Sequence, residues 1–362
     1  MVQPDAELQR TWRHRIKEAE AYLAQDHFER ALEQARLAAE IAQSIGNIGP
    51  LKRTAAILQK LSDWEAHARM FARIERLREP SGPVEWDGSH VRTLVVTERN
   101  NEHIGRPIRF ARLLRQAASR VDKCIVLAER RLISLFRRSF PGIEIRALDQ
   151  ATSTIEAADA IAGYQTLITL FGRSDEEILA GFRSLVAEPN QIHEMRKRYL
   201  PGPLIGISWG STNTRKSLPT LIEWARSMSA IPATYVSLQY GDVDADIEEF
   251  AKSGVNIVRD KTVDAFNDID ALAAQISAMD TVVSVSNTTV HLAGALGVET
   301  YVVVDVDRNL SLIWPLEGTT VPWYPSISLI RKDGSSWPQT MMRLQNTLRD
   351  RFADGERSAD RV

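Results

Sequence analysis

The sequence has almost no cysteine, since Cys124 is the only one in 362 residues. A single thiol excludes an internal disulfide and a metal site built from several cysteines, which fits a reducing cytoplasm. Cys124 lies in the apolar run CIVLA, so we expect it to be a buried strand residue. The charges nearly cancel as well, with 45 Lys and Arg against 47 Asp and Glu. No overall basic field therefore favours nucleic acid as a partner.

Long hydrophobic runs are also missing. The first fifteen residues, MVQPDAELQRTWRHR, have no apolar core of a signal peptide, and no segment reaches the ~20 apolar residues of a transmembrane helix. No paired-acid motif for a metal stands out. We therefore expect a cytoplasmic protein with no transmembrane segment. Its 362 residues are enough for two domains and an additional helical piece.

Residues 1–80 are predicted to be helical, with alanine and leucine at helical spacing. The order of residues resembles a tetratricopeptide-type (TPR-like) helical hairpin, with Asp26 and His27 in the turn and Phe28 at the start of the second helix. Two interpretations follow. This extension is either a cap packed on the next domain or a surface that binds a protein partner or acceptor.

Proline and glycine then mark a linker over 78–90, and strand-like and helical segments alternate beyond it. This alternation predicts two parallel α/β domains, at 91–185 and 200–335, followed by a C-terminal helix over 336–362. The strands are expected at 92–98, 123–129, 143–148, 164–171, 204–210, 233–241, 256–260, 281–285 and 300–304.

The most informative segment is 280–304, in which an apolar strand is followed by a polar turn, a helix and a second strand. The polar turn consists of Ser286, Asn287, Thr288 and Thr289. In parallel sheets, ligands bind outside the carboxyl ends of the strands, where helix N-termini offer free N–H groups to anions. These side chains can cap the helix and can also donate to a phosphate. We predict a diphosphate site here, with capping alone as the alternative.

A second polar stretch follows the strand expected at 204–210. Its backbone N–H groups can wrap a diphosphate, and its two cations lie where a leaving diphosphate would build up charge. An exposed loop is the alternative for the cations. The residues are Ser208, Gly210, Ser211, Asn213, Arg215 and Lys216.

Taken in order, these motifs resemble GT-B glycosyltransferases, specifically the heptosyltransferase-like domains that bacteria fuse to tetratricopeptide repeats. The matching motifs are GISWGS, RKSLPTLIEWA, VSLQYGD, DIDALAAQISAMDTVVSVSNTTVHLAGALG and PWYPSISLIRK, with ERRLISLFRRSFPG in the first half. The resemblance implies an α/β fold of two doubly wound, Rossmann-like domains facing each other across a cleft. It also implies sugar transfer from a nucleotide-sugar donor held mainly by the second domain, with inversion and without a metal or other cofactor. The C-terminal helix would cross back to the first domain.

The resemblance carries further expectations for single residues. Counterparts of Gln239 and Tyr240 lie near the nucleotide base, and His291 is either a donor ligand or a core residue. Asp268 and Asp270 are expected to cap a helix that begins near 271. Trp323 and Tyr324 are expected to close the cleft or to pack the last helix.

The first domain departs from the family pattern. Its first loop reads HIGRPIRFARLL, and Arg106 stands where the family has the acidic residue that acts as general base. An arginine cannot accept a proton at neutral pH. His103, Glu102 and Glu98 are close enough in sequence to replace it, and His103 has the best unperturbed pKa. Arg106 could instead hold an anionic acceptor or a donor phosphate.

Three hypotheses therefore remain. The first is a glycosyltransferase that acts on a protein or glycan acceptor. The second is a degenerate GT-B module that binds a nucleotide sugar or a protein partner without turnover. The third is a different enzyme on the same architecture, such as a nucleotide-sugar epimerase. The absence of G-x-G-x-x-G after the first strand argues against a dinucleotide dehydrogenase.

Overall fold

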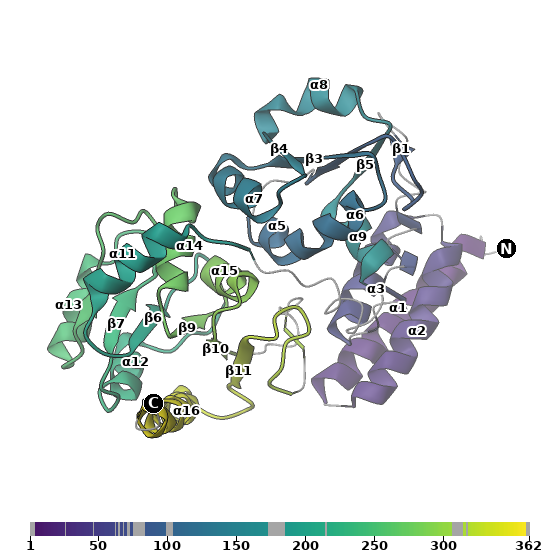
Figure 1. Ribbon diagram of the computed structural model, residues 1–362. Coiled ribbons are helices and arrows are strands. Elements are labelled where there is room, and N and C mark those ends of the chain that lie inside the picture. Colours follow the sequence, from purple (N-terminus) through teal and green to yellow (C-terminus); the bar gives the residue numbers. More distant parts are fainter. Residues whose placement is uncertain are drawn as a thin grey trace.

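The protein consists of a helical extension and two α/β domains, as Figure 1 shows. The fold comes from a computed structural model. The residues that it describes are 4–25, 27–45, 47–61, 63, 66–67, 69–70, 73–74, 84–98, 104–172, 185–213, 216–305, 314–315 and 318–359.

The extension begins with the predicted helical hairpin. The first helix ends at Ala24 and the second begins at Phe28, so His27 lies in the turn as expected. Alanines of the second helix are fully buried in a core that belongs to the extension alone. This core is fixed further by a hydrogen bond from Trp12 Nε1 to Thr54 Oγ1 at 3.0 Å. The helices are α1 (Pro4–Ala24), α2 (Phe28–Ser44) and α3 (Ile48–Lys60).

The first domain is a parallel sheet of five strands in the order β1-β5-β2-β3-β4. Cys124 is buried in β3, as predicted. The strands are β1 (Val84–Glu85), β2 (Thr93–Thr97), β3 (Lys123–Ala128), β4 (Glu144–Ala147) and β5 (Ala160–Ala162). The α-helices are α5 (Gly105–Phe110), α6 (Leu114–Ala118), α7 (Ile133–Ser139), α8 (Ala151–Glu156) and α9 (Tyr164–Phe171), and the 3-10 turns are η1 (Ala111–Leu113), η2 (Arg130–Leu132) and η3 (Leu148–Gln150).

Two predictions for this domain were wrong. The strand expected at 164–171 is the helix α9, and the fifth strand is the short β5 just before it. An apolar run of eight residues fits either structure, but here every third or fourth residue is buried: Tyr164, Leu167, Ile168 and Phe171. Part of the expected linker forms β1, which pairs with β5 at the sheet edge, so the domain begins near Val84.

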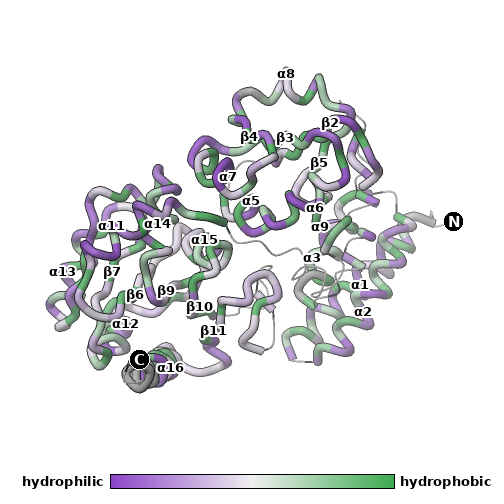
Figure 2. The backbone as a smooth tube through the Cα atoms, viewed as in Figure 1, coloured by the Kyte–Doolittle hydropathy of each residue, from purple (hydrophilic) through white to green (hydrophobic). Residues whose placement is uncertain are grey.

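The second domain is a parallel sheet of six strands in the order β11-β10-β9-β6-β7-β8. The colouring in Figure 2 agrees with the packing, because the outer α11 is mostly hydrophilic whereas the buried α15 is mostly hydrophobic. The strands are β6 (Leu204–Ser208), β7 (Thr234–Ser237), β8 (Ile257–Val258), β9 (Thr281–Val285), β10 (Thr300–Val304) and β11 (Ile327–Arg331). The helices are α11 (Pro189–Tyr199), α12 (Leu221–Met228), α13 (Asp244–Lys252), α14 (Ile269–Ser277), α15 (Thr288–Leu296) and α16 (Trp337–Ala359).

The C-terminal helix α16 differs from the expectation. It packs on α12 and on the sheet of the second domain, where Met341, Leu344 and Leu348 are buried, and it does not cross back to the first domain. Its apolar stripe, at spacings of three and four residues, matches this single surface. None of the described helices combines the length and apolar composition that a bilayer crossing requires.

The two domains meet in a packed seam. Phe110 of α5 contacts Trp323 of the second domain edge to face, with ring centroids 4.9 Å apart. Arg138 of α7 forms an ion pair with Asp270 of α14 and donates from Nε to the Val186 carbonyl at 2.7 Å. Trp323 therefore belongs to the contact between the domains.

We predict that Gly294→Ala lowers the free energy of unfolding by about 1–3 kcal/mol, the usual cost of overpacking. A Cβ at Gly294 would lie 2.5 Å from Cγ of the buried Tyr324 and 2.8 Å from Cδ1 of Ile327. Chemical denaturation measures the loss. The control is Gly49→Ala in α3, whose Cβ would lie 3.4 Å from its nearest neighbour. Equal unfolding midpoints for the two variants would contradict the packing described here.

Candidate functional site

In each sheet, the order in which the chain adds strands reverses at one point. Polar residues follow the strands on either side of both points. In the second sheet the chain order reverses between β6 and β9. In the first sheet it reverses between β2 and β5. Parallel sheets bind ligands at such points, outside the carboxyl ends of the strands. The loops after β6 and β9, and those after β2 and β5, are therefore the candidate site.

The loops after β6 and β9 are joined by Asn287. Its Nδ2 donates to Ser208 Oγ at 2.8 Å and to the Gly210 carbonyl at 3.0 Å. Its Oδ1 accepts from Val290 N at 3.4 Å, so Asn287 also caps α15, as the sequence predicts. Ser208 is fully buried and its hydroxyl is used inside this network. Ser208 and Asn287 thus hold the two loops together.

Gln239 belongs to the same network. Its Oε1 accepts from Ser208 Oγ at 2.9 Å and from Gly210 N at 2.8 Å. The side chain is therefore occupied in shaping the loop after β6. Beside it, the Tyr240 hydroxyl accepts from Thr212 N at 3.0 Å, and its ring lies 6.5 Å from that of Phe266.

Lys216 lies against the turn after β9. Its Nζ donates to the Ser286 carbonyl, which brings a cation to the N-terminus of α15. The side chain is partly buried, and this burial lowers the pKa of Lys216. No described carboxylate forms an ion pair with it. Within the described part of the chain, Lys216 is a cation available to an anionic ligand.

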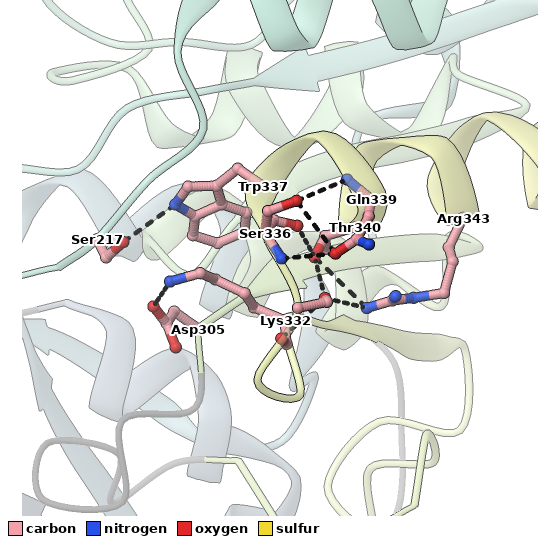
Figure 3. Close-up of polar contacts among 9 residues, drawn as sticks. Ser217, Asp305, Lys332, Ser336, Trp337, Gln339, Thr340 and Arg343 are labelled. Atoms are coloured by element: carbon pink, nitrogen blue, oxygen red, sulfur yellow. Dashed lines mark hydrogen bonds and ion pairs between the residues drawn. The ribbon is translucent and has the colours of Figure 1, made fainter.

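Ser217, the residue after Lys216, is held in place by the start of the C-terminal helix α16. Figure 3 shows Trp337 Nε1 donating to Ser217 Oγ, at 3.0 Å. The same cluster contains the ion pair between Lys332 Nζ and Asp305 Oδ2 at 2.7 Å, and Lys332 lies over the Trp337 ring. The start of α16 therefore positions the loop that carries Lys216.

His291 lies one turn into α15 and is buried. Its ring stacks on Trp314 with centroids 5.7 Å apart, and Nδ1 lies 3.2 Å from the Tyr324 hydroxyl. Burial, reinforced by the positive charges of Arg109 and Lys216, lowers the pKa of His291 to about 3. The imidazole is therefore neutral at neutral pH and supplies no positive charge to a phosphate.

The remaining residues of the predicted donor loops have varied surroundings. Ser286 Oγ accepts from Trp314 Nε1 at 2.9 Å, and Thr289 is buried. Ser211 Oγ accepts from Asn213 N at 3.3 Å in an exposed turn. Thr288 is partly exposed at the start of α15.

The first domain contributes Glu98, which directly follows β2. Its side chain is only 16% exposed, and Arg106 Nη1 lies 3.8 Å from Oε1. Burial raises the pKa of Glu98, and the charge of Arg106 opposes this rise. Oε2 has no hydrogen-bond partner among the described residues, and neither has the buried hydroxyl of Tyr164, which follows β5.

Glu98 and Tyr164 line one cavity at the carboxyl edge of the first sheet. The space beside them, of which open solvent at the mouth is a part, is about 330 Å³, and most of its lining residues are apolar. The sequence indicated Glu98 only as one of three acids or bases near Arg106. Tyr164 was missed because its segment was interpreted as a strand. The remaining lining residues are Ile104, Pro107, Leu127, Ala128 and Glu129.

The two halves of the candidate site meet at Gly105. A Cβ there would lie 3.2 Å from Cδ2 of His291, so the start of α5 rests directly on α15. This contact brings the residues around Arg106 next to the loop after β9. The predicted residues Glu102, His103 and Arg215 lie outside the described residues.

Two further observations bear on ligands. Asp268 Oδ1 accepts from Ala271 N at 2.9 Å, so Asp268 caps α14 as predicted, whereas Asp270 is used in the ion pair across the seam.

Among the described residues, no group of three or more His, Cys, Asp or Glu side chains is placed to hold a metal ion.

We predict that Asn287→Ala lowers the free energy of unfolding by about 2–4 kcal/mol, because a helix cap and two buried hydrogen bonds are lost together. Amide hydrogen exchange over 209–213 should also become faster. The matched control is Asp268→Ala, which removes only a cap and should cost about 1 kcal/mol. Unchanged exchange over 209–213 in Asn287→Ala would show that Asn287 does not hold the loop.

No protein-family model matches the chain. Protein FlbA of Caulobacter vibrioides is 30% identical over 322 residues, which cover 79% of this chain and 52% of FlbA. The chain thus spans about half the length of this curated relative.

Two solved structures are similar over most of the chain. The ADP-heptose LPS heptosyltransferase II of E. coli has a TM-score of 0.49 at 11% identity, covering 71% of this chain and 98% of that chain. A family 9 glycosyltransferase of Veillonella parvula has a TM-score of 0.47 at 12% identity, covering 68% of this chain and 87% of that chain.

Proposed function

We propose that the protein is a glycosyltransferase that moves a sugar from a nucleotide-sugar donor to a hydroxyl group of a protein or glycan acceptor. The donor diphosphate would bind between the loops after β6 and β9, beside Lys216. The acceptor would enter the cavity lined by Glu98 and Tyr164. The observation that carries the proposal is the contact of Gly105 with His291, because it makes the proposed acceptor site and the proposed donor site direct neighbours.

Glu98 is the general base in this proposal. It would accept the proton of the acceptor hydroxyl while the hydroxyl oxygen bonds to the anomeric carbon of the sugar. The bond from that carbon to the diphosphate oxygen breaks, and its electron pair leaves with the nucleotide. A buried carboxylate with a raised pKa suits this role, because a stronger base takes a proton more readily. Glu102 and His103 stay alternative bases.

The leaving diphosphate would gain negative charge during transfer. Lys216 and the N-terminus of α15 would offset this charge. These two elements supply positive charge without a metal, so we propose a metal-independent reaction. Attack from the first domain, on the side opposite to the diphosphate, would invert the anomeric centre.

A binding module without turnover is the second candidate. It is favoured by Arg106, which occupies the place of the family's acidic residue and lies 3.8 Å from Glu98. In this case a nucleotide or its sugar would bind at the loops after β6 and β9, but Glu98 would serve only to balance the charge of Arg106.

For the enzyme hypothesis we expect Glu98→Gln to lower kcat by 10²-fold or more, with little change in donor affinity, because the amide cannot accept the proton. Nucleotide release from a sugar donor, with acceptor present, measures the rate. The matched control is Glu156→Gln, an exposed carboxylate at the end of α8. A variant that keeps most of its kcat would assign the base to Glu102 or His103.

The pH profile gives a second readout of the same base. The rate should fall as the pH drops through the raised pKa of Glu98, because only the carboxylate accepts a proton. Arg106 opposes the rise of this pKa, so Arg106→Gln should move the acid limb to higher pH. An unchanged acid limb would mean that Glu98 does not control the rate.

Lys216→Met should lower kcat by about 10²–10³-fold, the usual effect of removing one group that stabilises developing charge. Chelation with EDTA should leave the wild-type rate unchanged. Lys252→Met, at an exposed position on α13, is the control. Loss of activity with EDTA would contradict the metal-independent mechanism, and an unaffected Lys216→Met would remove Lys216 from the donor site.

A further inference from the structure

Arg131 makes a contact between the domains that the proposed transfer reaction does not use. It lies in the 3-10 turn η2 of the first domain, just before α7, and α7 lies beside α14 of the second domain (Figure 1). Arg131 Nη1 donates to the carbonyl of Phe266, in the loop before α14, at 2.7 Å. The guanidinium also lies over the Phe266 ring, 4.9 Å from its centroid. Arg131 therefore holds Phe266 both by the backbone and by the side chain.

Phe266 is presented to Arg131 by a fixed turn, although 54% of the residue is exposed. Asp264 Oδ1 accepts from the backbone N–H groups of Phe266 and Asn267, both at 3.0 Å. Its Oδ2 accepts from Asn267 Nδ2 at 2.8 Å. An aspartate that accepts from the backbone two residues further on is typical of a tight turn. Because this turn sets the position of Phe266, Arg131 meets a preformed partner.

On the donor side, Phe266 leads to the loop after β6. Its ring centroid lies 6.5 Å from that of Tyr240, within the range over which aromatic pairs attract each other. The Tyr240 hydroxyl accepts from Thr212 N at 3.0 Å, and Thr212 belongs to the loop at which the donor diphosphate is proposed to bind. A continuous chain of contacts therefore runs from Arg131 through Phe266 and Tyr240 to Thr212.

Arg131 is also bound on the acceptor side. Its Nε lies 3.0 Å from both carboxylate oxygens of Glu129, and its backbone N–H donates to Glu129 Oε2 at 3.1 Å. Glu129 lines the same cavity as Glu98 and Tyr164. A guanidinium can make all these contacts together, because its N–H donors lie in one plane and its faces stay free for a ring. Arg131 thus has one partner in each half of the candidate site.

We propose that Arg131 is a positioning residue that couples the two halves of the site. It holds Phe266 and, through Tyr240, steadies the loop after β6 at Thr212. Cation–π contacts at exposed positions are weak, so this contact can form and break as the domains approach and separate. By linkage, a donor that binds better to the steadied loop favours the contact by the same factor. The effect on donor binding rests on the proposed function, whereas the coupling within the chain does not.

The first test is the rate of amide hydrogen exchange at Thr212, measured by NMR in the full chain without ligand. Arg131→Met and Phe266→Leu should each raise this rate about 2–5-fold, which corresponds to the loss of one exposed cation–π contact. The double variant should exchange no faster than the faster single variant, because both changes break the same chain of contacts.

Three further variants make this test decisive. Tyr240→Phe removes the hydroxyl that accepts from Thr212 N and should raise the rate at least as much as Arg131→Met. Arg131→Lys keeps the charge and a donor, so it should restore part of the slow exchange even if Arg131→Met folds poorly. The matched control is Arg130→Met, because the neighbouring Arg130 forms its ion pair with Asp149 inside the first domain. It should exchange at the wild-type rate.

The second test is the Kd of UDP, ADP and GDP, measured by calorimetry. Arg131→Met should bind whichever diphosphate the wild type binds about 2–5-fold more weakly, whereas Arg130→Met should bind it equally well. Wild-type exchange at Thr212 in Arg131→Met overturns the proposal, and so do additive effects in the double variant or an unchanged Kd. If the wild type binds none of the three diphosphates, the proposed function fails, and the exchange rates still decide whether Arg131 couples to Thr212.

Discussion

The close contact of α5 with α15 is the constraint on which the rest of the site depends. Each helix begins just after a strand at the point where its sheet reverses, so pressing the two helix starts together also brings both loop clusters together. Gly105 makes this approach feasible because a Cβ at that position would crowd His291 at 3.2 Å. The neutral, stacked imidazole gives α5 a flat surface without adding charge. The geometry of the site thus follows from packing between domains as much as from the loops themselves.

Much of the fold could be predicted from the sequence, because hydrophobic periodicity fixes the type of most segments. The start of the second helix at Phe28 and the helix cap at Asn287 were predicted at the right residues, but α15 begins at Thr288, within the predicted polar turn. The errors came from segments in which periodicity is ambiguous. An eight-residue apolar run at 164–171 fits a strand or a helix, and the two-residue β1 is too short to leave a pattern. The path of α16 depends on which surface its apolar stripe meets, and the stripe alone does not specify that surface.

The site was predicted less completely than the fold. A motif such as Ser-Asn-Thr-Thr marks a strand end followed by a helix, and this local pattern is visible in the sequence. Burial and charge balance are not local. Glu98 gains its raised pKa, and Arg109 its lowered pKa, only because distant segments cover them. Nothing in the run IRFARLL distinguishes Arg109 from an ordinary exposed arginine of an amphipathic helix.

The placement of α16 on the second domain has a consequence for how the molecule assembles. The extension, the first domain and the second domain each occupy one continuous stretch of chain. Domains made of continuous segments fold in order as they leave the ribosome. The first domain can therefore be complete while Trp323 and Tyr324 are still being synthesised. The contact of Arg109 with the Trp323 ring would then form only when the last domain docks, so it belongs to the final step of assembly.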